Sequence, residues 1–347
     1  MYDEFKTVSL VSQIFMGIAW FLNIVLLILI HARPDVHIGH LKNCFYWIIS
    51  LDLAYSAATG LSDLYWLFDG PMIAVFPTSF IANSWASNFM WFCFVFSLWG
   101  QLTIISSMFF YRWILICNKQ AFIRVLHSKW PHAILTVLAI ITLVGFASFT
   151  VATFGPTDLL RQQCRQLYSS AFPNVDWNTT YVMGYDGIMK AQYVASLIFI
   201  VVYFGSQIST TIFFAIKIYT TIGKAATSER SRRVHRLTFN MICVQAFFPL
   251  VCHYIPITVS MAFLVFSWSW PNLSLYMLYS FMIPPVVNPL ISIFFTYEYR
   301  KSLVNAFHKV TGYQIKARCV EDHSRVVTVS TVSKSHQSVH RSSLHVV

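Results

Sequence analysis

Seven long runs of apolar residues, separated by segments that contain charges or proline, dominate the chain. A helix that crosses a bilayer needs about 20 mostly apolar residues, and every run is long enough. The second run carries Asp52 and Asp63, whereas the first, sixth and seventh carry no charge. The pattern predicts an all-α membrane protein, a seven-transmembrane helix bundle with helices over 8–30, 43–67, 89–116, 132–154, 191–219, 238–265 and 274–296.

The composition supports a membrane protein over a soluble one. Hydrophobic residues make up 56% of the chain and charged residues only 11%, whereas soluble domains carry roughly 25% charged residues. The net charge of +11 does not indicate nucleic-acid binding, because the charges are excluded from the apolar runs and gather between them.

Lysine and arginine are distributed unequally between the two sets of loops. Of the 24 such residues, 20 fall on one side of the predicted membrane, and only Lys6, Arg161, Arg165 and Lys190 fall on the other. Cytoplasmic loops carry the excess of positive charge. The bias therefore predicts a bundle with its N-terminus outside.

Four parts follow along the chain. We predict an extracellular N-terminus over 1–7, a seven-transmembrane domain over 8–296, a short amphipathic helix on the inner membrane surface over 297–312, and a disordered cytoplasmic tail over 313–347. The amphipathic helix places basic residues beside apolar ones, which suits anionic inner-leaflet lipid.

The loop over 155–190 contains the sequon Asn178-Thr179-Thr180. Such a site is an acceptor for glycosylation in an exposed outer loop, so Asn178 is a candidate glycosylation site. No cluster of histidine, cysteine and carboxylate residues has the spacing of metal ligands, and no phosphate loop or nucleophile elbow is present. The sequence therefore indicates neither an enzyme nor a metal or other cofactor.

Several motifs together resemble those of a known family. Helix three ends in Tyr111-Arg112-Trp113, where rhodopsin-like receptors place an acid–Arg–Tyr triplet. Helix six contains Gln245 and Pro249, and helix seven contains Asn288-Pro289-Leu290 before Tyr299-Arg300. These motifs resemble those of the nematode serpentine chemoreceptors of the Str superfamily. The Asn-Pro-Leu sequence resembles that of serpentine receptor class delta.

The resemblance implies a G-protein-coupled chemosensory (olfactory) receptor and signal transducer. Such receptors bind small environmental chemicals and lie in the plasma membrane of sensory neurons, often at their cilia. Two other functions stay open: a seven-helix ligand-gated ion channel, which would have the opposite orientation, and a membrane transporter.

Ligand sites in helical bundles form between helices, and the resemblance places one between the outer halves of helices three, five, six and seven. On helix three, residues counted back from Arg112 by helical periods lie on the same face as Arg112 and lead toward the outer end of the helix. The predicted ligand-binding residues, for each of which ordinary helix packing is the alternative, are Phe94, Ser97, Gln101, His253, Ile257, Tyr276 and Tyr279. The aromatic, sparsely charged set suits a small apolar ligand.

A second group of residues suits a switch that couples to a cytoplasmic G protein. Arg112 is a candidate latch or contact at the G-protein cleft, or else an arginine that snorkels to lipid phosphates. Asp52 is a candidate to pair with Asn23 and Asn288, or else a structural polar contact. Pro249 is a candidate hinge, with Pro289 as a further kink.

The resemblance also implies a disulfide between the outer end of helix three and the loop over 155–190. Cys93 and Cys164 are the candidates. The basic loop over 224–236 suits either an acidic G-protein surface or anionic lipid.

Overall fold

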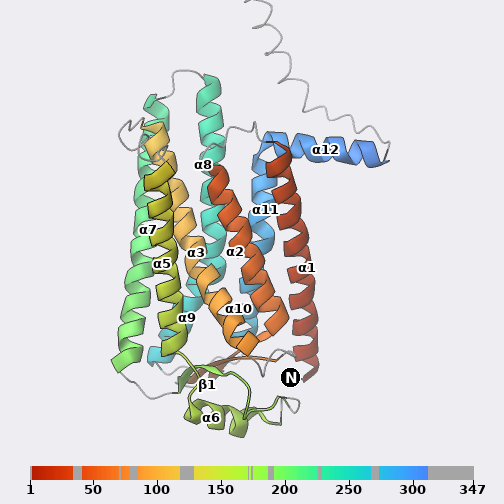
Figure 1. Cartoon of the computed structure of the whole chain (residues 1–347), viewed down its shortest axis with the longest axis vertical. Helices are drawn as coiled ribbons and strands as arrows, with labels where there is room; N and C mark the ends of the chain where they lie inside the picture. Colours follow the sequence, from red (N-terminus) through yellow and green to blue (C-terminus); the bar gives the residue numbers. More distant parts are fainter. Residues whose placement is uncertain are drawn as a thin grey trace, which may run out of the picture. The chain divides into compact units, whose positions relative to one another are not determined.

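The structure is a computed structural model that describes residues 2–33, 41–69, 72–78, 85–117, 129–170, 172, 175–186, 191–225, 229–266 and 273–311. Helices form its main part (Figure 1). Their bounds are α1 Tyr2–Ala32, α2 Leu41–Ser62, α3 Trp85–Ile116, α5 Lys129–Thr153, α6 Asp158–Tyr168, α7 Ala191–Ala225, α8 Glu229–Pro249, η1 Leu250–Tyr254, α9 Ile255–Phe266, α10 Leu273–Met282, α11 Pro284–Phe295 and α12 Tyr297–Thr311.

The predicted seven-helix bundle is confirmed. Its members are α1, α2, α3, α5 and α7, the continuous α8–η1–α9 unit, and the α10–α11 pair. Six of these helical segments are long and apolar enough to cross a membrane. The exception, α2, has 22 residues but includes Lys42, Asn43 and Asp52, and these polar residues lower its hydropathy.

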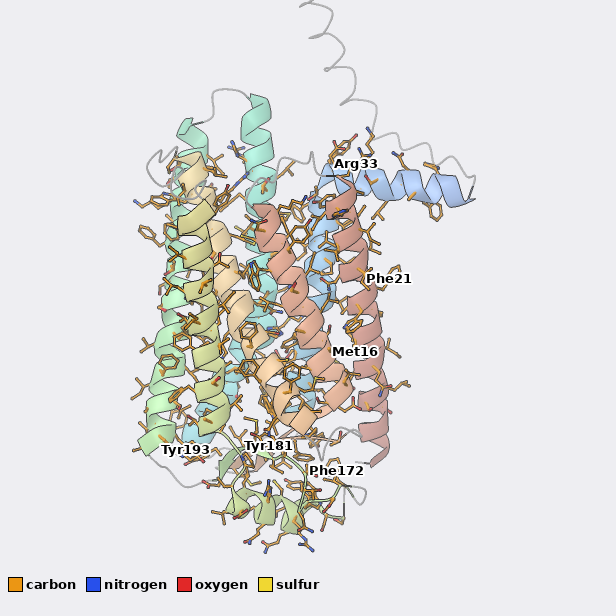
Figure 2. The ribbon with its side chains drawn as sticks, in the orientation of Figure 1. Met16, Phe21, Arg33, Phe172, Tyr181 and Tyr193 are labelled. Carbon is orange, nitrogen blue, oxygen red and sulfur yellow. The ribbon has the colours of Figure 1, made fainter. Side chains whose placement is uncertain are left out.

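Apolar side chains cover the outside of the bundle, as lipid contact requires. Phe21 on α1 is 66% exposed and points away from the bundle (Figure 2). Ile198 and Val201 on α7 are similarly exposed. Exposing this apolar surface to water would cost free energy, whereas contact with the hydrocarbon core of a bilayer would not.

The second predicted span is wrong at its outer end. Helix α2 ends at Ser62, and residues 64–69 form a strand instead. Asp63 lies between them with a positive φ of 46°, a conformation in which a helix does not continue. Asp63 therefore does not share a helical face with Asp52, and its carboxylate accepts a hydrogen bond from Ser9 at 2.7 Å.

The sixth and seventh spans are interrupted where the sequence places proline. Pro249 closes α8 and is followed by the π-helical segment η1. Ile283 separates α10 from α11, which begins with Pro284 and Pro285. Proline removes a backbone donor and clashes with the preceding turn, and π-helical turns occur mostly as single-turn bulges inside longer helices.

One end of the bundle carries a small antiparallel sheet that the all-α prediction did not include. It contains β1 Leu64–Asp69, β2 Met72–Pro77 and β3 Met183–Asp186, in the order β1-β2-β3. Ile73 pairs with Tyr185 and Val75 with Met183. Helix α6 lies at the same end (Figure 1), and Thr157 caps it by accepting a hydrogen bond from the Leu160 N–H at 3.1 Å. We call β1, β2, α6 and residues 175–186 the cap.

The sheet is buried on both faces because each strand alternates between two apolar cores. Ile73, Val75, Met183 and Tyr185 belong to the core of the helix bundle. The opposite face forms a separate core with α6, Trp177 and Phe172, and Figure 2 shows Phe172 at the cap end of the bundle. The other members of this core are Leu67, Met72, Ala74, Phe76, Leu160, Cys164 and Val182. The cap is thus a packed layer rather than a loop.

Helix α12 covers Tyr297–Thr311 within the segment predicted as amphipathic. Its proposed position on the membrane surface stays a prediction. The predicted disordered tail over 313–347 lies outside the described residues.

Gly184→Ala should destabilise the cap, because Gly184 has a φ of +152° and an added Cβ would overlap the Ile73 carbonyl oxygen. Strain and overpacking of this kind cost roughly 2–3 kcal/mol, so the thermal unfolding midpoint should fall by several degrees. The measurement is the reaction of Cys164 with a thiol-reactive dye during heating, since this cap thiol is buried.

Gly205→Ala is the matched control, because a Cβ there meets no atom within 4 Å. It should leave the midpoint unchanged or raise it slightly. Equal midpoints for the two variants would contradict the close approach of β3 to β2.

Candidate ligand cavity and buried polar network

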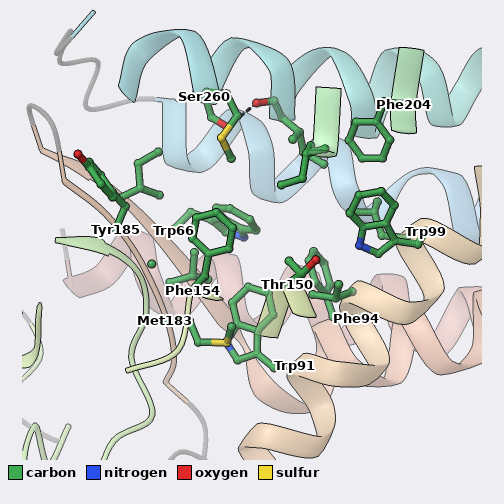
Figure 3. A pocket seen from close by; sticks show the side chains of 18 residues that line it. Trp66, Trp91, Phe94, Trp99, Thr150, Phe154, Met183, Tyr185, Phe204 and Ser260 are labelled. Atoms are coloured by element: carbon green, nitrogen blue, oxygen red, sulfur yellow. Dashed lines mark hydrogen bonds between the residues drawn. The ribbon is translucent and has the colours of Figure 1, made fainter. Parts of the chain in front are cut away.

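A cavity of about 120 Å³ lies between α3, α5, α7, α9 and the inner face of the sheet. Strands β2 and β3 close it at the cap end through Ile73, Val75, Met183 and Tyr185 (Figure 3). Its other lining residues come from β1 and the four helices and include Trp66, Trp91, Phe94, Trp99, Phe154, Phe204 and Ile257.

The cavity wall is aromatic and carries no charge among the described residues that line it. Trp99 packs against Phe204 with ring centroids 4.9 Å apart. The hydroxyls of Thr150 and Ser260 donate to carbonyls of their own helices, at 2.9 and 2.8 Å. Such a wall suits a small uncharged ligand, because a charged one would lose its hydration without compensation.

Five of the seven predicted ligand residues face the interior. Phe94 and Ile257 line the cavity. Ser97, Gln101 and His253 are buried, at most 1% exposed, but do not line the cavity wall.

The expectation for Tyr276 and Tyr279 is corrected. Their side chains are 50% and 39% exposed on the outside of α10, while Met277 and Phe281 on the opposite face are buried. A transmembrane helix is apolar on both sides, so sequence alone did not fix which face turns inward.

The buried carboxyl group of Asp52 is at the centre of a polar network. Gln101 Nε2 donates to Asp52 Oδ1 at 2.8 Å. Asn288 Nδ2 lies 3.2 Å from each carboxyl oxygen of Asp52. Because these hydrogen bonds join α2, α3 and α11, they compensate for a polar group held out of water.

The network continues toward α8. Ser292 Oγ donates to the Asn288 carbonyl at 3.0 Å and accepts from Gln245 Nε2 at 2.9 Å. Asn23 does not join the Asp52 carboxyl group as predicted. Its amide donates to the carbonyls of Ala19 and Pro285, at 2.9 and 3.0 Å, and so links α1 to α11.

A row of buried rings connects the cavity to the interior of the bundle. Phe94, which lines the cavity, stacks on Tyr55 with centroids 5.1 Å apart. The ring centroids of Tyr55 and His253 are 5.0 Å apart. His253 lies in η1, and its Nε2 is 3.4 Å from the Phe281 carbonyl of α10. Packed rings therefore run without a break from the cavity wall to the π-helical segment.

Arg112 is buried, with 7% of its surface exposed, at the end of α3 that lies away from the cap. Its Nη2 is 3.1 Å from Nδ1 of His235 on α8. The acidic neighbour of rhodopsin-like receptors is replaced by Tyr111. Among the described residues, His235 on the facing helix is thus a hydrogen-bond partner of this guanidinium.

The predicted disulfide is wrong. Cys93 and Cys164 are both free thiols. Cys93 lies about two turns inside α3, whereas Cys164 is enclosed in the cap core. Burial raises the pKa of the Cys164 thiol to about 12. Because these two cysteines are not joined, the core around Cys164 is held by packing rather than by this cross-link.

Asn178 is exposed in a turn of the cap. Hydrogen bonds from the Thr179 hydroxyl and the Asn178 N–H lower the pKa of Asp176, and these bonds measure 2.8 and 3.1 Å. Asn178 Oδ1 accepts from Arg165 at 3.3 Å. The turn leaves the predicted glycosylation site accessible.

Sequence reasoning missed His235, Ser292 and the strand residues of the cavity roof. His235 lies in a segment interpreted as a basic loop, although α8 begins at Glu229. The side chains of residues 223–234 lie outside the described part of the structure. Among the residues that are described, no group of histidine, cysteine and carboxylate side chains is placed to hold a metal ion.

Comparisons with known proteins agree with this arrangement. The family model described as "Serpentine type 7TM GPCR chemoreceptor Str" matches residues 8–304. A crystal structure of squid rhodopsin has a similar fold, with a TM-score of 0.64 and 10% sequence identity, covering 93% of this chain and 91% of that one. Among curated proteins, no relative matches the chain.

Asn288→Ala should destabilise the bundle, because it removes the amide that faces both oxygens of the buried Asp52. The expected loss is about 1–3 kcal/mol, measured by thermal unfolding of the purified protein. Asn240→Ala, at an exposed position on α8, is the control and should have little effect.

A double-mutant cycle with Asp52→Ala isolates the pair. We expect a coupling free energy of about 1 kcal/mol or more, typical of side chains in direct contact. A coupling close to zero would show that the two side chains do not interact.

Proposed function

This chain belongs to the Str family of serpentine seven-transmembrane chemoreceptors, and on that premise we propose that it binds a small apolar compound in the cavity beneath the sheet and signals through a cytoplasmic G protein. The observation that carries the proposal is the aromatic, uncharged cavity itself. Its volume of about 120 Å³ favours a small compound.

The proposed orientation places the cap outside the cell. Helix α1 begins at the cap end of the bundle (Figure 1), and Asn178 is exposed in the cap. The excess of lysine and arginine on the opposite side supports the same orientation.

The proposed switch runs from the cavity to the end of α8. A ligand that contacts Phe94 would shift its ring. The packing of Phe94 on Tyr55, and of Tyr55 on His253, would transmit this shift to η1, next to the candidate hinge at Pro249. Release of His235 from Arg112 would then free the end of α8 for a G protein. The network of Asp52, Asn288 and Ser292 would hold α11, with its Pro289, in register during this movement.

Partners and location are also proposals. Basic segments at the cytoplasmic end would meet the G protein or anionic inner-leaflet lipid. By family, the receptor would lie in the plasma membrane of sensory neurons and at their cilia, and the Asn-Pro-Leu spelling supports serpentine receptor class delta.

A screen of small uncharged organic compounds tests this function, with G-protein activation as the readout in cells that express the receptor at their surface. We expect activation by compounds that fit an aromatic cavity. Ligand-evoked currents that persist without G protein would instead support the channel, and ligand-driven accumulation of the compound would support the transporter.

Ile257→Trp should fill the cavity and raise the concentration for half-maximal activation at least tenfold, with surface expression unchanged. The bulky indole would occupy ligand space, because Ile257 lines the cavity and is only 8% exposed. Ile255→Trp, two residues away and 47% exposed to lipid, is the matched control. Similar dose–response curves for the two variants would argue against this cavity as the ligand site.

His235→Ala should raise basal G-protein activation about fivefold. It removes the partner of the Arg112 guanidinium, a contact of about 1 kcal/mol. Leu237→Ala, at an exposed apolar position on the same helix, should leave basal activation unchanged. Basal activation equal in both variants would exclude His235 as a latch.

A further inference from the structure

The cavity beneath the sheet is small enough to limit the size of its ligand. Its volume is about 120 Å³, and an apolar cavity of about 150 Å³ in another protein stays dry and binds benzene. Residues with little side-chain bulk, Thr150, Gly184 and Ser260, lie among much larger ones in the wall. The space therefore matches one six-membered ring with a small substituent rather than two fused rings or a long chain.

Large aromatic side chains in the wall pack against one another (Figure 3). The ring centroids of Trp91 and Phe94 are 5.3 Å apart, and that of Trp66 lies 6.3 and 6.2 Å from them. Trp99 packs on Phe204 with centroids 4.9 Å apart. Because close-packed side chains move apart only at a cost in free energy, the wall resists a ligand larger than the space.

The hydroxyl groups of the wall are already paired or directed away from the space. Those of Thr150 and Ser260 donate to the carbonyls of Phe146 and Ile257. Figure 3 shows the hydroxyl of Tyr185 directed away from the other labelled side chains. The surface that the described residues present to the cavity is apolar, so a ligand hydroxyl or carbonyl would lose its hydrogen bonds to water without replacement.

An aromatic hydrocarbon suits this wall better than water or a polar compound. A buried water typically makes about three hydrogen bonds to protein groups, which apolar side chains such as Met183 and Met261 do not supply. A hydrocarbon ring gains dispersion contacts with the wall on several sides. It can also take the offset-stacked and edge-to-face arrangements that aromatic rings prefer.

The indole N–H of Trp91 is the group that could favour a different ligand. It is buried and has no hydrogen-bond partner among the described residues. A ring turned so that this N–H met the ligand would favour a compound with an acceptor oxygen. In the structure the cavity surface is apolar, so the N–H does not reach it, and an aromatic aldehyde is the compound that separates the two cases.

We propose that the ligand of this cavity is a single-ring aromatic hydrocarbon, a benzene with a small alkyl or halogen substituent and no hydrogen-bond donor or acceptor. This inference rests on the proposed function, because it names the ligand class of the same site. The volume and the packed rings set the size limit, and the apolar surface sets the polarity limit.

The test uses the full-length receptor in lipid nanodiscs, with fluorobenzene as the probe and fluorine nuclear magnetic resonance as the readout. We expect a bound signal distinct from those of free probe and of probe dissolved in receptor-free nanodiscs. Ile257→Trp should remove the bound signal because it fills the cavity, whereas Ile255→Trp, exposed to lipid, should retain it. Equal signals in the two variants, or no bound signal in the native receptor, would overturn the inference.

Competing compounds measure the two limits, with free concentrations corrected for uptake by receptor-free nanodiscs. Toluene should displace fluorobenzene at concentrations about tenfold lower than phenol or benzaldehyde, because these lose hydrogen bonds to water. Naphthalene should not displace it. Benzaldehyde that competes better than toluene would overturn the polarity limit and assign the Trp91 N–H as a ligand contact. Displacement by naphthalene would overturn the size limit.

A larger cavity should admit a larger ligand. Ile200 lines the cavity and is 8% exposed, whereas Ile198 on the same helix is 60% exposed. Ile200→Ala should therefore let naphthalene displace fluorobenzene, and Ile198→Ala, the matched control, should not. A retained fluorobenzene signal shows that each variant is folded, and Ile200→Val is a milder truncation that should raise the affinity for propylbenzene relative to toluene. Equal exclusion of naphthalene by the two alanine variants would contradict the size limit.

G-protein activation separates failure of this inference from failure of the proposed function. Toluene should activate the native receptor or block its activation by a compound from the screen. Activation by hydrogen-bonding compounds that Ile257→Trp suppresses, without binding of fluorobenzene, would contradict the ligand class and leave the function intact. Binding of fluorobenzene and toluene with no effect on G-protein activation would instead contradict the proposed function.

Discussion

The close approach of β3 to two other backbones is the constraint on which the proposed ligand cavity depends. Gly184 lies against Ile73 of β2, where no side chain fits, and its N–H bonds to the carbonyl of Phe154 at the end of α5. These contacts fix the sheet across the end of the helices. Since the same strands present Val75, Met183 and Tyr185 to the cavity, the backbone contact that holds the cap also sets the shape of the cavity roof.

A second constraint is the carboxyl group of Asp52 in the middle of the bundle. A buried carboxyl is expensive unless it is hydrogen-bonded, and here Gln101 and Asn288 supply the donors from two other helices. Those helices also carry the cavity residue Phe94 and the prolines of α11. The hydrogen bonds to Asp52 thus join the helices around the cavity to the helices proposed to move. At the end of the bundle away from the cap, the contact between Arg112 and His235 joins α3 to α8.

Much of the helical part of this fold could be predicted from the sequence, because hydrocarbon demands continuous apolar runs. The run over 132–154 corresponds to α5 and the run over 191–219 to α7. The sequence pattern assigns residues 64–67 to the second helix, because a short apolar run does not distinguish strand from helix. Gly70 and Pro71, between two apolar segments of six residues, were the available signal for a hairpin.

The site was harder to predict than the helices. Helical periodicity predicts that Phe94 points into the bundle, and the Asn-Pro motif singles out Asn288. The sequence does not reveal that Tyr276 and Tyr279 point outward, because only packing against other helices fixes the rotation of α10. The contact between Arg112 and His235 joins residues 123 positions apart, and no local pattern specifies such a pair. The disulfide between Cys93 and Cys164 could not be predicted for the same reason. The resemblance to a family suggests which cysteines to pair, but it does not show that the two thiols are close in space.

The most direct measurement is an experimental structure of the receptor bound to an activating compound found by the screen. We expect density for the compound between Phe94, Trp99 and Phe204, under a sheet whose Tyr185 and Met183 remain in the roof. Density for the compound outside the helices, with the cavity filled by its own side chains, would contradict it.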